Sequence, residues 1–256
     1  MSIAIIGGTG VYSLDSDQPV RRETVETPYG EARALLTRLA ARDVVFLPRH
    51  GEEHSIAPHR INYRANITAL RQLGVSSIFS TNAVGSLHPD MPPGDLVAID
   101  QFIDLTKRRD ATFFDAEDCE VRHVDMTEPY CPRLRRTLVQ AAQAEAVPLR
   151  VGGTYLCAEG PRFETPAEIR TFRQWGADLV GMTNYPEVAL AREAQICYAT
   201  ICIVTNFAAG ISPTPLSHQE VLDCMDASSA AVQKLILAAV AAEHDDGSCR
   251  CHEPIT

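Results

Sequence analysis

The sequence has 256 residues, of which 45% are hydrophobic, and its formal net charge at pH 7 is −10. This length suits one large α/β domain, and the negative charge argues against a nucleic-acid partner while leaving room for a small anion in a local basic pocket. No apolar run has the length needed to span a bilayer and no basic leader segment opens the chain, so we expect a cytoplasmic protein without a membrane partner.

Apolar runs and amphipathic segments alternate along the chain. Short apolar runs predict strands, whereas apolar spacing of three and four residues after a capping residue predicts helices. Their alternation predicts an α/β fold, a sheet wrapped by helices, without repeats or linkers. The predicted strands cover residues 3–6, 33–39, 43–47, 76–80, 96–99, 151–157, 178–182 and the run from 195, and the predicted helices cover 62–73, 132–146, 187–194 and the segments capped by Thr165 and Ser217.

The first strand leads into glycines at positions 7, 8 and 10, with Thr9 between them. Glycines after a strand let backbone amides approach an anion closely, which favours a phosphate-binding loop. A dinucleotide-binding fingerprint is an alternative, but its third glycine would fall on Ser13, and the residues that follow are poor helix formers. A plain tight turn is the remaining interpretation.

Arg49 and His50 follow the strand predicted at 43–47. The planar guanidinium suits phosphate oxygens. His50 and His54 are four residues apart, but no third ligand completes a metal site, so we expect no metal ion. A surface Arg-His pair without a role is the alternative.

Two later segments place polar groups before predicted helices. Phe163 could stack on a base while Glu164 accepts a hydrogen bond from a ring N–H; alternatively, Phe163 is a core residue and Glu164 is solvated. The amides and the Thr183 hydroxyl of segment 181–187 could bind an anion or sugar hydroxyls, or they could simply cap the helix that follows.

The stretch from 195 to 210 begins as a β-branched apolar run, typical of a strand buried on both faces, and ends in Thr205 and Asn206. Strand ends in α/β sheets line the ligand crevice, and a buried amide needs a partner, which we interpret as a purine base. Polar side chains placed in this way predict one converging site, made of Thr9, Arg49, His50, Asn82, Phe163, Glu164 and Asn206.

These segments together resemble the trimeric purine nucleoside phosphorylases, in the group that includes 5′-methylthioadenosine phosphorylase. The resemblance extends in order over nearly the whole chain. It implies a single-domain nucleoside-phosphorylase fold with a mixed central sheet over residues 1–245, followed by a tail at 246–256, and a homotrimer or hexamer. The matching motifs are Ile-Ile-Gly-Gly-Thr-Gly (5–10), Arg-His-Gly (49–51), Asn-Tyr-Arg-Ala-Asn (62–66), Asn-Ala-Val-Gly-Ser-Leu (82–87), Pro-Gly-Asp (93–95), Asp-Gln-Phe-Ile-Asp (100–104), Glu-Gly-Pro-Arg-Phe (159–163), Trp-Gly-Ala-Asp (175–178), Met-Thr (182–183) and Pro-Glu (186–187).

The resemblance also implies a role for each matching residue. Met182 would contact the ribose through its backbone, and Phe163 would flank the base. His123 is similar to a residue that a neighbouring subunit lends to the 5′ end of the sugar. The phosphate would be held by Thr9, Arg49, His50, Asn82, Ala83 and Thr183.

The end of the strand from 195 distinguishes two branches of this family. Adenosine-type members resemble Thr-Asp-x-Asp there, whereas this chain has Thr205, Asn206, Phe207 and Ala208. Asn206 can donate to a carbonyl O6 and pair with N7, and Glu164 can accept from a protonated N1. We therefore expect the 6-oxopurine nucleosides inosine and guanosine as substrates, in purine salvage.

His218 matches a position that is apolar in methylthio-specific members and His in hydroxyl-recognising ones. It predicts a 5′-hydroxyl substrate, with 5′-methylthioinosine or 5′-methylthioadenosine as alternatives; a solvent-facing His is the other interpretation. Phosphate would attack C1′ as co-substrate, with Asn206, Glu164 and His50 as catalytic residues and no cofactor. A hydrolytic nucleosidase and a non-catalytic nucleoside-binding module remain as functional alternatives.

The chain has eight cysteines. Cys157, Cys197 and Cys202 lie in apolar contexts and are expected to pack as small hydrophobes. Cys249 and Cys251, near the end, could form a strained disulfide or bind an adventitious metal ion, and some archaeal members of the resembling family carry disulfides in such a Cys-x-Cys. We expect this tail to be disordered and without a role.

Overall fold

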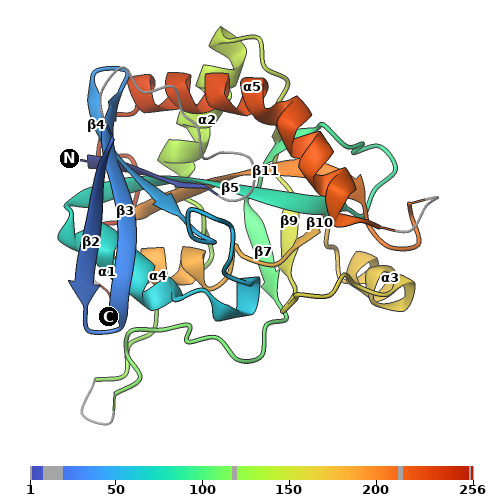
Figure 1. The fold of residues 1–256 in the computed structure, drawn as a ribbon, viewed down its shortest axis with the longest axis horizontal. Helices are drawn as coiled ribbons and strands as arrows, with labels where there is room; N and C mark the ends of the chain where they lie inside the picture. The colour runs from blue at the N-terminus through green and yellow to red at the C-terminus, as the bar shows by residue number, and fades with distance from the viewer. Residues whose placement is uncertain (1, 8–19, 117–119, 213–215, 254, 256) are drawn as a thin grey trace.

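The computed structural model describes residues 2–7, 20–116, 120–212, 216–253 and 255. Within these residues, one mixed sheet of eleven strands forms the centre of the molecule (Figure 1). The predicted α/β class with a mixed sheet is therefore confirmed. The strands are β1 (Ser2–Gly7), β2 (Arg21–Thr27), β3 (Gly30–Leu39), β4 (Arg42–Pro48), β5 (Val75–Ser86), β6 (Leu96–Ala98), β7 (Gln101–Asp104), β8 (Arg150–Val151), β9 (Thr154–Cys157), β10 (Leu179–Gly181) and β11 (Cys197–Phe207).

Helices cover both faces of this sheet. Figure 1 shows α2 and α5 on one side of it and α1 and α4 on the other. Two apolar core clusters correspond to these two layers. A short 3₁₀ helix, Pro58–Arg60, precedes α1, and the α-helices of the described residues are α1 (Tyr63–Gln72), α2 (Pro132–Ala144), α3 (Pro166–Gln174), α4 (Glu187–Glu193) and α5 (His218–Ala242).

β1 illustrates why continuous apolar runs predict the central strands. Ile3 and Ile5 lie in the cluster that contains α2 and α5 residues, whereas Ala4 and Ile6 lie in the cluster on the opposite face. Because successive side chains alternate across a sheet, a strand covered on both faces needs an apolar residue at every position.

The direction of pairing brings several strand ends to one edge. The main order is β2-β3-β4-β1-β5-β10-β9-β7, and β11 pairs with β5 and β6. β1 is parallel to β4 and β5, and β11 is parallel to β5, whereas β10 pairs with the end of β5 in the antiparallel direction. The carboxyl ends of β1, β4, β5 and β11 therefore lie together.

Two strands extend further than predicted. β5 continues through Asn82 to Ser86, and β11 continues through Asn206 to Phe207, because the two remain paired to their ends. The register of this pair shifts between Val204 and Asn206. Asn82 and Asn206 thus lie within strands and not beyond them, and the irregularity at Thr205 marks where the ladder changes.

Other boundaries also differ from the sequence expectation. The sequence does not predict β2, which is highly charged and only half covered, or β7, which has only four residues. The strand expected over residues 151–157 is divided into β8 and β9 by Gly152 and Gly153, which have positive φ. The capping box of Thr165 with Glu168 and the cap of Ser217 on α5 are confirmed.

Helix α5 corrects the statement that no apolar run could span a bilayer. Its 25 residues are long and apolar enough by length and composition, and no other helix of the described ranges meets that condition. A core helix has the same properties. The side chains of Leu235, Ile236 and Ala239 are fully buried in the cluster shared with α2 and β11, so this face of α5 packs on the core.

The C-terminal tail packs against the protein. Cys251 is only 6% exposed. Gln195 Nε2 donates to the carbonyl oxygens of His252 and Glu253, at 3.2 and 2.8 Å. The expectation of a disordered tail is wrong for the tail residues that the structure describes, because buried contacts and backbone hydrogen bonds hold them.

Candidate active site

A cavity of about 400 Å³ lies at the edge where the strand ends meet. Its walls come from the segment after β4, the ends of β5 and β11, the segment before α3, the segment after β10 and the start of α5. Segments far apart in sequence thus line one space. The predicted site residues that line it are Arg49, His50, Asn82, Ala83, Phe163, Glu164, Met182, Thr183, Asn206, Ala208 and His218.

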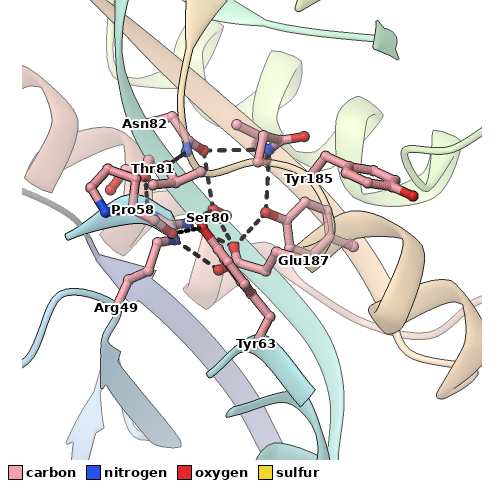
Figure 2. A network of polar contacts seen from close by, with 12 residues as sticks. Arg49, Pro58, Tyr63, Ser80, Thr81, Asn82, Tyr185 and Glu187 are labelled. Atoms are coloured by element: carbon pink, nitrogen blue, oxygen red, sulfur yellow. Dashed lines mark hydrogen bonds and ion pairs between the residues drawn. The ribbon is translucent and has the colours of Figure 1, made fainter. Parts of the chain in front are cut away.

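Arg49 is the most deeply buried cation of the cavity wall, 1% exposed. Its Nε and Nη2 donate to the two carboxylate oxygens of Glu187, both at 2.7 Å, and further bonds reach Thr81 O and Ser80 Oγ (Figure 2). Burial lowers the pKa of the Arg49 guanidinium, but the adjacent Glu187 carboxylate raises that pKa by more, so Arg49 stays charged. One Nη1–H remains outside these four bonds.

Glu187 holds Arg49 in place. Its carboxylate also accepts from the Tyr198 hydroxyl at 2.6 Å and from Ser80 Oγ at 3.2 Å. The Glu187 side chain is fully buried, so these donors are what compensate its negative charge. The sequence places Glu187 only in a Pro-Glu motif, and its partner lies 138 residues away.

His50 is neutral at physiological pH. Its Nδ1 lies 2.8 Å from the carbonyl oxygen of Ile56, which can only accept, so Nδ1 carries the proton. Burial is the main reason that the pKa of His50 is lowered to about 4, and the Arg49 charge contributes. Nε2 is then a hydrogen-bond acceptor in the cavity wall, suited to a protonated phosphate oxygen or a sugar hydroxyl.

Asn82 and Thr183 are joined across the sheet. Asn82 Nδ2 donates to Thr183 Oγ1 at 2.6 Å, which leaves the Thr183 hydroxyl proton for another acceptor. The Thr183 backbone N–H donates to the Tyr155 hydroxyl at 3.2 Å. Gly181 makes this arrangement possible, because a Cβ there would lie 2.3 Å from the Tyr155 oxygen.

Asn206 presents an amide that is 5% exposed. Its Oδ1 accepts from Thr205 Oγ1 at 2.9 Å, and its Nδ2 donates to Phe207 O at 2.9 Å. Since an amide has two donor hydrogens and two acceptor lone pairs, one of each stays available for a ligand. Gly85 leaves room for this amide, since a Cβ there would lie 3.2 Å from Asn206 Nδ2.

Phe163 and Glu164 lie in the same wall, on the segment before α3. Phe163 is 38% exposed, so its ring is open to contact. Burial is the main cause that raises the pKa of the Glu164 carboxyl, and the nearby Glu168 adds to it. A carboxyl in this environment gains from a hydrogen-bond donor such as a ring N–H.

Three histidines follow one another along the cavity wall. The ring centroids of His50 and His54 are 4.4 Å apart, and those of His54 and His218 are 6.5 Å apart. Burial and the neighbouring His218 lower the pKa of His54. His218 thus reaches the cavity from the first turn of α5, although its side chain is largely exposed.

Two predicted site residues are not in this wall. Thr9 lies outside the described residues. His123 is exposed in the segment between β7 and α2 and does not line the cavity of its own chain. Its assignment to a neighbouring subunit stays a prediction.

Sequence reasoning missed several residues that shape the site. Ser80 and Tyr198 lie within strands, where they are indistinguishable from ordinary strand residues, yet both bond to the Arg49 and Glu187 pair. Leu216 and Val221 add apolar surface beside His218. Polar residues inside otherwise apolar strands are the one signal that could have indicated Ser80.

Comparison with known proteins places the chain in a family. Residues 2–241 match the Phosphorylase superfamily. The 6-oxopurine nucleoside phosphorylase of Pyrococcus furiosus is 51% identical over 99% of this chain and 97% of its own length. A probable S-methyl-5′-thioinosine phosphorylase of Methanopyrus kandleri is 46% identical over 99% of this chain and 97% of its own. The structure of methylthioadenosine phosphorylase from Schistosoma mansoni in complex with adenine has a TM-score of 0.92 and 36% identity, covering 96% of this chain and 94% of that one. The chain therefore belongs to the Phosphorylase superfamily, as one of its nucleoside phosphorylases.

Proposed function

We propose that this enzyme is a 6-oxopurine nucleoside phosphorylase, which converts inosine or guanosine and phosphate into the free base and ribose 1-phosphate. The supporting observation is that the Asn206 amide and the Glu164 carboxyl line the same cavity as Arg49, His50 and Thr183. The name and 51% identity of the Pyrococcus furiosus relative agree with this assignment.

The base is recognised by one amide and one carboxyl. The free Nδ2–H of Asn206 donates to O6 of the purine, and its Oδ1 accepts from N7–H once N7 is protonated as the base leaves. Glu164 accepts from N1–H, which hypoxanthine and guanine carry and adenine lacks. With adenine, the N1 acceptor would face the Glu164 carboxylate, which is also an acceptor. Leaving such buried polar groups unpaired disfavours adenosine relative to inosine by about a hundredfold or more.

The buried pair of Arg49 and Glu187 positions the groups that bind phosphate. The remaining Arg49 N–H and the Thr183 hydroxyl donate to phosphate oxygens, and His50 Nε2 accepts from a protonated one. Thr9, Asn82 and Ala83 complete this end, and Met182 meets the ribose through its backbone. The held phosphate is positioned below C1′ of the sugar, which lowers the entropic barrier to attack.

The reaction is one substitution at C1′. A phosphate oxygen forms the new bond to C1′ while the bond from C1′ to N9 breaks, and its electron pair passes into the purine ring. Positive charge on the ribose is stabilised by the anionic phosphate. The negative charge that reaches O6 is stabilised by Asn206 Nδ2–H, while Phe163 packs on the ring. The purine anion takes up one proton at N7, which balances the proton that the phosphate group loses on forming ribose 1-phosphate, and Asn206 Oδ1 accepts a hydrogen bond from this N7–H. Phosphate is itself the nucleophile, so the scheme requires no cofactor.

At the 5′ end, His218 hydrogen-bonds the ribose hydroxyl. A second substrate, S-methyl-5′-thioinosine, is favoured by the apolar Leu216 and Val221 beside His218 and by the name of the Methanopyrus kandleri relative. His123 of a neighbouring subunit completes this end of the site, in a homotrimer or hexamer. The free thiols of the described cysteines are in keeping with the reducing cytoplasm.

A substrate panel tests this function. Inosine, guanosine, adenosine and methylthioinosine are assayed with phosphate, and each again in a phosphate-free buffer. We expect base release from inosine and guanosine only with phosphate, together with ribose 1-phosphate. Release without phosphate would indicate a hydrolase, binding without release would indicate a non-catalytic module, and comparable turnover of adenosine and inosine would overturn the assignment.

A further inference from the structure

Four cysteines from separate parts of the chain meet away from the cavity. They are Cys131 at the start of α2, Cys197 at the start of β11, and Cys249 and Cys251 in the tail. Cys197 and Asn206 lie at opposite ends of β11, so roughly 30 Å of strand separates this cluster from the base-binding amide. The cluster has no part in the reaction described above.

The sulfur positions are close enough together to suit a four-coordinate metal centre. All four Sγ atoms lie within 4.8 Å of one another, and Cys197 Sγ is 3.5 Å from Cys249 Sγ. Zinc bonded tetrahedrally to four thiolates at about 2.3 Å holds its sulfurs about 3.8 Å apart. Two disulfides would need only two close pairs, whereas here all six pairs are close, and all four cysteines are free thiols.

The surroundings suit a negatively charged thiolate centre. Arg133 is 3% exposed, and its Nη2 donates to Cys197 Sγ at 3.5 Å. Cys131 occupies the N-cap position of α2, where the helix dipole favours negative charge. Four thiolates with one divalent cation carry a charge of −2. The helix N-terminus stabilises this charge, and so does the Arg133 guanidinium, which also pairs with the Glu243 carboxylate at 2.9 Å.

Hydrogen bonds outside the cluster fix the tail that carries Cys249 and Cys251. His252 Nδ1 lies 2.8 Å from Gln195 O, and Arg136 bonds to Ser248 Oγ, so one end of the tail segment is fixed on the turn before β11 and the other on α2. Cys251 is buried while Cys249 is only half-buried. The half-buried thiol leaves a route from solvent for an ion.

We propose that Cys131, Cys197, Cys249 and Cys251 bind one zinc ion, which fastens the C-terminal tail to the body of the enzyme. Binding replaces four thiol protons by one Zn²⁺, and the protons pass to the buffer. Because ligands from the tail and from the core share the ion, its binding energy adds to the stability of the folded chain.

The test uses the full-length enzyme, purified with reductant and then reconstituted with Zn²⁺ or Co²⁺. We expect about one zinc per chain by elemental analysis, a Kd below about 10 nM, and intense tetrahedral thiolate bands with Co²⁺. A chelator that removes the metal should lower Tm by more than about 5 °C. The C249S/C251S variant should retain less than a tenth of the metal and should not respond to the chelator.

Two variants separate metal binding from packing. Cys224 lies outside the cluster, and its Sγ bonds to Val204 O, so C224S should keep the full metal content. C251H should bind zinc tightly, unlike C249S/C251S, because an imidazole can replace a thiolate on zinc but cannot form a disulfide.

Clear outcomes would overturn the proposal. These are less than a tenth of an equivalent of zinc after reconstitution of the wild type, or equal metal content in wild type and C249S/C251S. A third is a count of four alkylated thiols in the wild-type chain, purified without added reductant and denatured without reduction. Eight alkylated thiols support the metal site, and four would indicate two disulfides in its place.

Discussion

The Arg49 guanidinium and the Glu187 carboxylate form a two-bond ion pair, each bond 2.7 Å long, with both side chains 1% exposed. A buried pair of this kind is expensive to break, because the partner left behind keeps an uncompensated charge. The pair therefore fixes where Arg49 can direct its last N–H.

Replacing Glu187 tests this. We expect Glu187→Ala to lower the free energy of unfolding by about 3 to 5 kcal/mol, measured by urea denaturation. The exposed pair of Arg22 and Glu52 is the matched control, and Glu52→Ala should leave the midpoint almost unchanged. If both variants unfold at the wild-type midpoint, the buried pair does not stabilise the fold.

Asn206→Ala removes the amide that faces the base. We expect kcat/KM for inosine to fall at least about hundredfold, near 3 kcal/mol of transition-state stabilisation, as measured by initial rates. Asn206→Asp should raise the ratio of adenosine to inosine turnover, because a carboxylate accepts from an exocyclic amine. A loss below about tenfold in the Ala variant would remove Asn206 from the mechanism.

The pH dependence of stability follows from His50. Its pKa is lowered to about 4 in the folded protein, against about 6.5 in an unfolded chain. The unfolded state takes up the proton first as the pH falls, so the contribution is present above pH 6.5 and is lost between 6.5 and 4. The loss amounts to about 3 kcal/mol.

Urea midpoints measured across this pH range check the sign. His50→Gln should flatten the fall between pH 6.5 and 4, whereas the exposed His59→Gln should follow the wild-type curve. Parallel curves for His50→Gln and wild type would show that His50 is not buried in its neutral form.

His218→Ala addresses the 5′ end of the sugar. Loss of one neutral hydrogen bond should lower kcat/KM for inosine about tenfold and leave that for methylthioinosine nearly unchanged. The ratio of the two values is the measurement. An unchanged ratio would mean that His218 does not contact the 5′ substituent.

The central strands and the converging site could be predicted because both leave local signals. The run that becomes β11 is apolar at nearly every position. Polar residues stand out after β4 and in the carboxyl-terminal halves of β5 and β11, namely Arg49, Asn82 and Asn206. Local signals end there. β2 reads as a charged segment because only one of its faces is half covered, and pairing with β3 makes it a strand.

Contacts across the fold could not be predicted. Glu187 and Arg49 are 138 residues apart, and no local sequence pattern near either residue indicates that the two are in contact. Cys197 reads as a small apolar residue of a strand, and only the return of the tail brings Cys249 to it. The tail is polar and terminal, which predicts disorder, but its anchors lie on α2 and on Gln195 in the turn before β11.

The register of β11 links two distant chemistries. Its first residue, Cys197, faces the thiol cluster, and Asn206, near its last, faces the cavity. A slip of one position along β5 would turn both side chains to the opposite face of the sheet at once. A change of register would therefore disturb both ends of the strand, whereas an exchange of residue 206 alone would alter the contact to the base and leave the pairing of β11 with β5 in place.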